Sequence, residues 1–218
     1  MRILIADDHP LVRAMVRQVL AGAFGDAAFG EAGNATEALH CIQLEDWDVV
    51  VLDVFMPGRS GLDILRDIRA AQPQLPVLIL TAYSEEEFAV RVIESGADGF
   101  LTKDCPIEDL IVAVRKVTTG HKFISPAVAE CLARRLQSPT GMQPHESLSE
   151  REYEVLCQLA QGHNVAWIAR ELVLSPKTVQ TYRRRLRVKL RVTSTAELTR
   201  YAVEHRLIPS LTYSAPAA

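Results

Sequence analysis

The sequence predicts an α/β domain with a doubly wound, five-stranded parallel sheet, followed by a small all-helical domain. Short apolar runs alternate with helical hydrophobic patterns over residues 1–120, an order typical of parallel sheets with helical crossovers. From residue 146 onward the hydrophobic patterns have helical spacing. We therefore expect domains at residues 1–120 and 146–210, joined by a helix and a flexible linker at 121–145 and followed by a tail at 211–218.

Strand signals recur through the first domain. Four consecutive apolar residues at Val49–Leu52, three of them β-branched, predict a strand that is buried on both faces. The other expected strands are Ile3–Ala6, Phe29–Ala32, Val77–Leu80 and Gly99–Thr102. Amphipathic helical patterns follow each strand, from Leu11–Leu20 to a last helix at about Pro106–Val117.

Helix-start signals place several boundaries. Three stretches pair an N-cap candidate with a glutamate three residues later, which predicts reciprocal capping boxes at Asn34–Glu37, Ser149–Glu152 and Ser194–Glu197. Ser84 is a further N-cap candidate, before an acidic first turn. Ser125–Pro126 starts a helix to about Gln137, and Ser138–Pro144 then holds too many helix breakers for regular structure.

In the second domain, Asn164 is expected to cap a short helix, and Ser175–Pro176 a long one that ends near Leu190. Gly162 and the Val173–Leu174 turn separate these helices.

Composition narrows the class of protein. The chain has 218 residues, 48% of them hydrophobic, which suits packed globular domains. No signal peptide is visible and no apolar run approaches the roughly 20 residues of a membrane span, so a cytoplasmic protein without a membrane partner is expected. The cysteines lack metal-site spacing and are interpreted as reduced structural thiols: Cys41, Cys105, Cys131 and Cys157.

Charge is distributed unevenly along the chain. Residues 1–145 hold 13 Lys and Arg against 20 Asp and Glu, a net charge of −7, whereas residues 146–218 hold 11 against 7, a net charge of +4. This asymmetry favours two modules with different partners, and the partner of the basic second module is expected to be a polyanion.

Reactive side chains follow the expected strands. Asp7 and Asp8 come after the first strand, Asp53 after the third, Thr81 after the fourth and Lys103 after the fifth. Because the carboxyl ends of parallel strands share one edge, these groups should converge there. Neighbouring carboxylates repel unless a cation neutralises them, and an all-oxygen site suits Mg²⁺. An ammonium and a hydroxyl beside them can hold a phosphoryl group on a carboxylate.

These residues, together with Met56-Pro57-Gly58, resemble the receiver domain of two-component response regulators over about residues 1–120. The resemblance implies a flavodoxin-like fold in which Asp53 accepts a phosphoryl group from a sensor histidine kinase. It also implies that Asp8 binds Mg²⁺ with help from Asp7, and that the backbone carbonyl of Phe55 is a further ligand.

The same resemblance gives Thr81 the role of binding the phosphoryl group and shifting with it. An aromatic residue in the last strand responds in that family, and Phe100 stands at its place. A plain core phenylalanine is the alternative interpretation. His9, beside Pro10, is expected in the loop that starts the first helix rather than as a phosphorylated histidine.

The long helix at 176–190 has a basic face. Val179, Tyr182, Leu186 and Leu190 form its buried stripe, which turns the other residues outward. Six of the nine residues from Arg183 to Arg191 are basic. A short helix, a tight turn and a second helix with such a face form a helix-turn-helix, whose second helix can enter the major groove.

From helical phase, Gln180, Thr181 and Arg184 are expected to reach base edges, while Lys177, Arg185 and Lys189 hold phosphates. Residues from about Leu148 to Ile208 resemble the LuxR-type helix-turn-helix, matching at Leu148-Ser149-Glu150-Arg151-Glu152 and Thr178-Val179 among other positions. With the receiver this resembles the NarL/FixJ class. The chain departs from it at Val165, Ala166, Gln180, Tyr182 and Arg191, which leaves the operator sequence open.

The sequence favours a non-enzymatic, phosphorylation-switched transcription regulator that binds promoter half-sites as a homodimer. One alternative is a DNA-binding regulator that ignores phosphorylation because its receiver is inert. Another is a Mg²⁺-dependent phosphohydrolase, but such enzymes fit a D-x-D nucleophile, whereas Asp7 and Asp8 are adjacent here.

Overall fold

The computed structural model describes residues 1–54, 56, 61–81, 86–137, 143–205 and 207–208. The chain divides into two compact units, Met1–Ser138 and Pro139–Ala218, each of which is described by itself.

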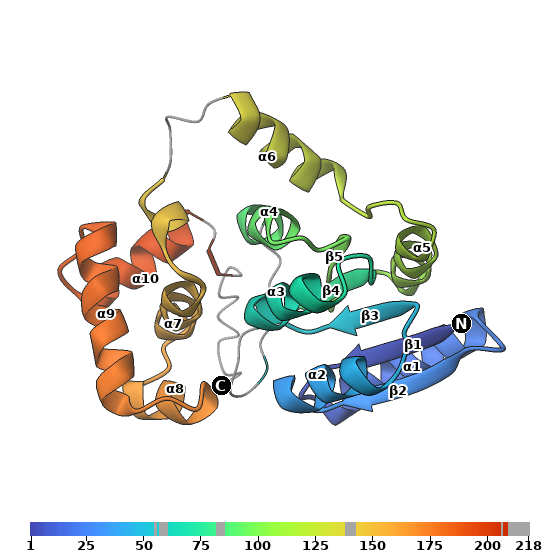
Figure 1. Cartoon of the computed structure of the whole chain (residues 1–218). Coiled ribbons are helices and arrows are strands. Elements are labelled where there is room, and N and C mark those ends of the chain that lie inside the picture. Colours follow the sequence, from blue (N-terminus) through green and yellow to red (C-terminus); the bar gives the residue numbers. More distant parts are fainter. Residues whose placement is uncertain (55, 57–60, 82–85, 138–142, 206, 209–218) are drawn as a thin grey trace, which may run out of the picture. The chain divides into compact units, whose positions relative to one another are not determined.

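The first unit is built on a five-stranded parallel sheet. Its strands are β1 (Arg2–Ala6), β2 (Ala28–Ala32), β3 (Val49–Leu52), β4 (Val77–Thr81) and β5 (Gly99–Thr102), in the spatial order β2-β1-β3-β4-β5 (Figure 1). The order reverses between β1 and β3, where the chain crosses from one half of the sheet to the other. The predicted doubly wound α/β fold is confirmed, and such reversals are where ligands bind in open parallel sheets.

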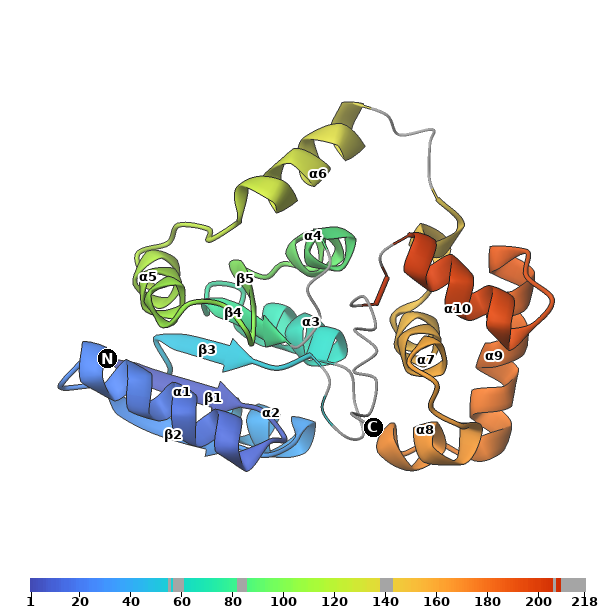
Figure 2. The ribbon, with the colours of Figure 1, turned by 180° about the vertical axis from the view of Figure 1, so that it is seen from behind.

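Helices cover both faces of the sheet. They are α1 (Pro10–Ala23), α2 (Ala35–Leu44), α3 (Gly61–Ala71), α4 (Glu86–Glu94), α5 (Ile107–Thr118) and α6 (Pro126–Gln137). The opposite views of Figures 1 and 2 show α1 and α2 on different faces. Residues that alternate along the strands, such as Ile3, Ile5 and Val51, join the core formed with α1 and α5. Leu4, Val50 and Ile79 point to the other face and are also fully buried.

The segment after α5 covers the edge of β5. Phe123 forms a parallel bridge with Gly99, and its carbonyl accepts a hydrogen bond from the backbone N–H of Phe100 at 3.3 Å. Lys122 Nζ donates to the carbonyl of Ala97 at 2.7 Å. The chain then turns into α6, which packs against α4 and belongs to the first unit, although the sequence predicted it as part of the linker.

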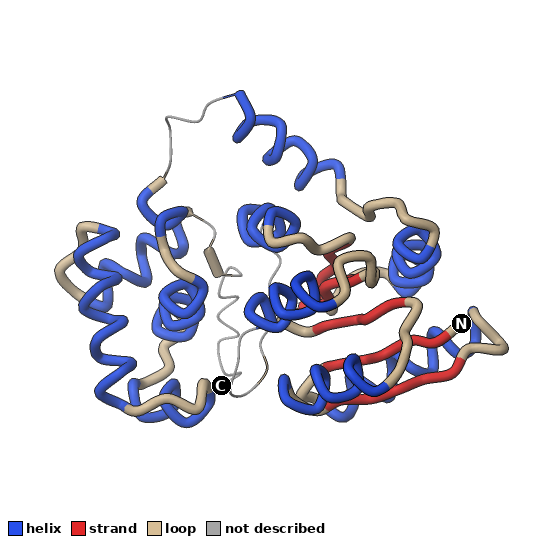
Figure 3. Tube along the Cα trace, in the orientation of Figure 1, coloured by secondary structure: helices blue, strands red, loops and turns tan. Residues whose placement is uncertain are grey.

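The second unit is helical, as predicted. A short 3₁₀ turn, η1 (Pro144–Ser147), precedes α7 (Glu150–Ala160), α8 (Val165–Glu171), α9 (Pro176–Leu190) and α10 (Thr195–Glu204) (Figure 3). Helix α7 is the centre of this unit, since α8, α9 and α10 all pack against it. Pro144 was predicted to lie in irregular structure but begins η1, because proline fits the first position of a helical turn. Most of the predicted breaker segment lies outside the described residues.

The predicted N-caps at Asn34, Ser149, Asn164, Ser175 and Ser194 all accept a backbone N–H three residues on. Only Ser149 completes the reciprocal capping box. At the other two predicted boxes, the glutamate accepts the N–H of the residue before the cap instead, at 2.7 Å for Glu37 and 2.6 Å for Glu197. Ser84 lies outside the described residues.

Backbone geometry explains the difference. The φ angle is −67° at Ser149 but −158° at Asn34 and −127° at Ser194. A more extended φ turns the N–H of the cap residue away from the first helical turn, so the preceding N–H becomes the nearer donor.

No disulfide joins the four cysteines, all of which lie in the described part of the chain. Within that part, none of the helices combines the length and the apolar character that crossing a membrane requires.

Candidate functional site

The carboxyl edge of the sheet brings three of the predicted residues into direct contact. Asp7 follows β1 and Asp53 follows β3, and each is only 3% exposed. Lys103 follows β5, and its Nζ atom lies 2.7 Å from Oδ2 of both aspartates. Two buried carboxylates therefore share one ammonium.

Strand register accounts for this convergence. The backbone N–H of Asp53 donates to the carbonyl of Ala6 at 2.8 Å, which continues the β1–β3 ladder past its last pair. The N–H of Lys103 donates to the carbonyl of Thr81 at 2.7 Å and does the same for β4 and β5. The site is thus built on strand ends that the sheet itself fixes.

Gly61 allows the chain to return closely after Asp53. Its N–H donates to the carbonyl of Val54 at 2.7 Å. A Cβ atom at this position would lie 2.4 Å from the Val54 Cα and 2.6 Å from the Asp53 carbonyl oxygen. Any larger residue would displace the backbone that carries Asp53.

The charge on Lys103 is stabilised in place. Burial lowers the pKa of its ammonium, but the negative charge of Asp53 and the hydrogen bonds to Asp53 and Asp7 outweigh burial, so that the pKa is raised. Lys103 therefore stays protonated at neutral pH and neutralises one of the two carboxylates.

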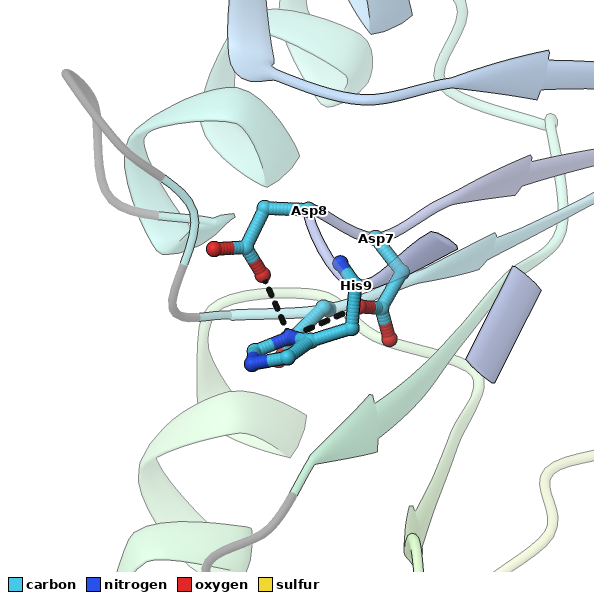
Figure 4. A group of neighbouring side chains, drawn as sticks. Asp7, Asp8 and His9 are labelled. Atoms are coloured by element: carbon cyan, nitrogen blue, oxygen red, sulfur yellow. Dashed lines mark hydrogen bonds and ion pairs between the residues drawn. The ribbon is translucent and has the colours of Figure 1, made fainter. Parts of the chain in front are cut away.

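Asp8 and His9 complete an acidic cluster (Figure 4). Asp7, Asp8, His9 and Asp53 each offer one ligand atom, and these atoms all lie within 4.8 Å of one another. His9 Nδ1 lies 2.7 Å from Asp8 Oδ1 and 3.2 Å from Asp7 Oδ1. Asp8 Oδ1 is buried, yet no hydrogen bond of good geometry reaches it within the described structure.

His9 is the member of this cluster that sequence reasoning did not assign to the site. It is the N-cap residue of α1, as its predicted place in the loop requires. Its backbone N–H donates to Asp7 Oδ1 at 2.8 Å, so the same residue orients one carboxylate with its main chain and faces another with its ring. The sequence feature that could have indicated this role is the position of His9 directly after Asp7 and Asp8.

The predicted switch residues, Thr81 and Phe100, lie on the neighbouring strands β4 and β5. Thr81 is fully buried at the end of β4. Phe100 is 8% exposed, and its ring meets the Phe88 ring of α4 edge to face, with 6.3 Å between centroids. This contact links β5 to α4. Phe55, predicted as a metal ligand through its carbonyl, lies outside the described residues.

In the second unit, α9 has the rotation that its sequence pattern predicts. Val179, Leu186 and Leu190 are buried, whereas Tyr182, predicted in the same stripe, is half-buried. Of the residues predicted to contact DNA, Thr181 is half-buried. The others are exposed: Lys177, Gln180, Arg184, Arg185 and Lys189. The Thr181 hydroxyl donates to the carbonyl of Lys177 at 3.0 Å.

Lys189 has a role within the unit that the sequence did not indicate. Its Nζ atom donates to Glu152 Oε2 at 2.6 Å and to the carbonyl of Ser147 at 3.1 Å. The Glu152 side chain is 3% exposed and also accepts the N–H of Ser149 at 2.8 Å. Lys189 therefore joins the end of α9 to the start of α7.

Two non-glycine residues with positive φ delimit the α8–α9 region. Val173 has a φ angle of 52° in the turn between the helices, and Arg191 has a φ angle of 56° directly after α9. A left-handed conformation is disfavoured for residues with a Cβ atom, most of all for β-branched valine. Both turns are therefore held by the surrounding packing against a local preference.

Comparisons with known families match both units. A model of the response regulator receiver domain matches residues 3–115, and one of bacterial regulatory proteins of the luxR family matches residues 146–202. Response regulator GacA of Pseudomonas aeruginosa is 38% identical over 208 residues, which cover 95% of this chain and 97% of GacA. Response regulator UvrY of Escherichia coli K12 is 34% identical over 213 residues, covering 97% and 98%.

Solved structures give the same result. RcsB from Salmonella enterica serovar Typhimurium, bound to promoter rprA with the phosphomimetic BeF₃⁻, is 25% identical with a TM-score of 0.64, covering 93% of this chain and 98% of RcsB. RcsB bound to promoter P1flhDC is 26% identical with a TM-score of 0.66, covering 94% and 98%.

Proposed function

Because this chain belongs to the response regulators that join a receiver domain to a LuxR-type DNA-binding domain, we propose that phosphorylation of Asp53 by a sensor histidine kinase controls how it binds DNA. One observation carries this proposal: the buried Asp53 carboxylate lies at the carboxyl edge of the sheet, 2.7 Å from the Lys103 ammonium and within the cluster formed by Asp7, Asp8 and His9. Residues 1–120 would be the switch, and residues 146–210 the output.

The donor set fits a small divalent cation. Asp8 Oδ1 is buried beside the His9 ring, whose Nδ1 lies 2.7 Å away, and the three carboxylates each offer a ligand atom within 4.8 Å of the others. Carboxylate oxygens suit Mg²⁺, for which we propose Asp7, Asp8, Asp53 and the Phe55 carbonyl as ligands. When bound, Mg²⁺ neutralises negative charge that develops on a transferred phosphoryl group.

The protein's own residues have distinct parts in the transfer. Asp53 is the nucleophile, and one of its carboxylate oxygens forms the new bond to phosphorus as the bond to the kinase histidine nitrogen breaks. The Lys103 ammonium, which already donates to Asp53, donates to a phosphoryl oxygen. The buried Thr81 hydroxyl binds a second phosphoryl oxygen.

The switch then passes along the edge of the sheet. A shift of Thr81 changes the space available to its neighbours on β4 and β5. The edge-to-face contact between Phe100 and Phe88 transmits that change to α4. This route uses side-chain packing, which has discrete arrangements rather than continuous ones.

For the output we propose that α9 enters the major groove. RcsB, which is similar to this chain over both units, has been solved bound to promoter DNA, which supports DNA as the partner. Gln180, Thr181 and Arg184 would reach base edges, with Lys177, Arg185 and Lys189 on phosphates. One helix reads few base pairs, so we expect a homodimer on two half-sites, acting in the cytoplasm as a regulator rather than as an enzyme.

The test is to label the protein with a small phosphodonor and Mg²⁺ and to measure DNA binding in parallel. Asp53→Asn should lose labelling, whereas Asp104→Asn, an exposed acid next to Lys103, should keep it. Full labelling of Asp53→Asn would remove Asp53 from this role. Wild-type DNA affinity that ignores the phosphodonor would favour an inert receiver, and turnover of phosphate esters would favour a phosphohydrolase.

A further inference from the structure

Arg13 contacts the loop that carries the acid pair. It lies in the first turn of α1, and its side chain is 18% exposed. Its Nη1 atom donates to the backbone carbonyl of Asp7 at 2.6 Å. The backbone N–H of Asp7 donates in turn to the carbonyl of Ala32 at 3.1 Å. Both polar groups of the Asp7 main chain are therefore held, one by β2 and the other by Arg13.

The carbonyl that Arg13 holds belongs to the peptide joining Asp7 to Asp8. Because a peptide unit is planar, fixing its oxygen fixes the direction in which the Asp8 Cα continues. Asp7 does not depend on this, since its carboxylate is bound by Lys103 Nζ at 2.7 Å and by the His9 N–H at 2.8 Å. Asp8 Oδ1 has no hydrogen bond of good geometry in the described structure. The contact that it does make, 2.7 Å to His9 Nδ1, comes from the next residue of the same loop, so the backbone of this loop sets the position of Asp8.

Arg13 is itself held in place. Its Nε atom lies 3.5 Å from Glu31 Oε2 on β2, an ion pair without a hydrogen bond of good geometry in the described structure. Arg17, one helical turn further along α1, also pairs with Glu31, at 3.2 Å, but is more than half exposed. The two arginines therefore share a partner, and only Arg13 is seen to bond to the acid-pair loop.

We propose that Arg13 is a positioning residue that holds the Asp7–Asp8 peptide so that the Asp8 carboxylate is presented to the divalent cation. This inference rests on the proposed function of the acidic cluster. Arg13 is not among the proposed ligands, and it acts through the backbone carbonyl of Asp7. Partners of this kind, one step removed from a metal ligand, typically change metal affinity by roughly 10- to 100-fold when they are lost.

The experiment measures Mg²⁺ and Mn²⁺ affinity of the full chain by calorimetry without a phosphodonor, and the Mg²⁺ dependence of Asp53 labelling. Arg13→Gln should weaken metal binding about tenfold. Labelling at saturating Mg²⁺ should stay at the wild-type level, because Asp53, Lys103 and Thr81 are unchanged. Arg13→Lys keeps a cationic donor and should recover part of the affinity, while Arg17→Ala should match wild type.

Wild-type metal affinity in Arg13→Gln, or a matching loss in Arg17→Ala, would overturn the inference. Should Arg13→Gln not fold, Arg13→Lys decides: weaker metal binding than wild type supports the inference, and wild-type binding rejects it. A wild-type chain that binds no metal and accepts no phosphoryl group would instead reject the proposed function, so the two failures are distinguishable.

Discussion

Replacing Lys189 by alanine separates two roles for one residue. From helical phase, Lys189 is expected to hold a DNA phosphate. In the structure its ammonium also lies 2.6 Å from Glu152, whose side chain is 3% exposed and caps α7. We predict that Lys189→Ala lowers the stability of the second unit, whereas Lys177→Ala, an exposed lysine at the start of the same helix, leaves it unchanged.

The size of the effect follows from burial. Removing one partner of a fully buried ion pair costs roughly 3–5 kcal/mol, because a charge stays behind without compensation. Lys189 is 36% exposed and the Ser149 N–H remains bonded to Glu152, so water and the backbone offset part of that cost. We expect a loss of about 1–3 kcal/mol. For a domain of this size, a loss of 2 kcal/mol lowers Tm by roughly 8–16 °C.

Scanning calorimetry of the intact chain measures this loss when the unfolding transition of the second unit is compared between wild type and variant. The pH dependence gives a second signature. Burial raises the pKa of Glu152, but the hydrogen bond and charge of Lys189 and the Ser149 N–H outweigh it and lower the pKa. A lowered folded-state pKa gives stability that is present above the unfolded pKa, near 4.5, and is lost as pH falls through the folded value. The difference between wild type and Lys189→Ala should therefore shrink in acid.

Equal unfolding temperatures for Lys189→Ala and Lys177→Ala at pH 7 would show that the contact between Lys189 and Glu152 does not stabilise the second unit. The salt dependence of DNA binding gives the complementary result. Lys177→Ala should lower the slope of log affinity against log salt by about 1 per monomer. If Lys189 stays bonded to Glu152 in the DNA complex, it does not bind a phosphate. Lys189→Ala should then leave the salt dependence of DNA binding unchanged, as long as the variant is folded.

Three further predictions concern the output unit and its connection. Arg184→Ala should relax the preference for one base pair per half-site by about 1–3 kcal/mol in footprints, and an unchanged preference would mean that α9 docks in another rotation. Arg191→Gly should stabilise the second unit by about 1 kcal/mol in urea titrations, because glycine adopts the left-handed conformation that arginine holds at φ 56°; no gain would place the strain elsewhere. Limited proteolysis should cut within Ser138–Pro144, and a fragment from near Gln143 should bind DNA at least as well as the intact unphosphorylated chain; much weaker binding would show that the receiver supplies dimer contacts.

Sequence reasoning succeeded where the signal is a period or a strand end. Apolar runs placed all five strands, and helical spacing placed the buried side of α9 at Val179, Leu186 and Leu190. The meeting of Asp7, Asp53 and Lys103 followed from parallel topology, because parallel strands deliver their carboxyl ends to one edge. These features follow from the spacing of apolar residues along the chain and from the parallel direction of the strands.

Contacts made by long side chains could not be predicted in this way. Lys189 and Glu152 are 37 residues apart in the sequence. Arg13 binds the main-chain oxygen of Asp7, and because every residue has such an oxygen, the sequence does not indicate which one is bound. The capping boxes show the same limit over a shorter distance. Asn34, Ser149 and Ser194 share one sequence pattern, yet a difference in φ at the cap decides which N–H the glutamate accepts.

In the second unit, one ion pair helps to hold α9, the helix that we propose for DNA contact. The box at Ser149 is the one whose glutamate also binds a lysine, so Glu152 fixes the start of α7 and the end of α9 at once. The Glu152 carboxylate is buried, whereas the Lys189 side chain is 36% exposed, so water reaches the contact from the lysine side only. The face of α9 that we propose for DNA contact is thus oriented by the apolar stripe along the helix and by one ion pair at its end. A change at Glu152, whose side chain is only 3% exposed, should therefore act on DNA binding through the orientation of α9 rather than through a contact of its own.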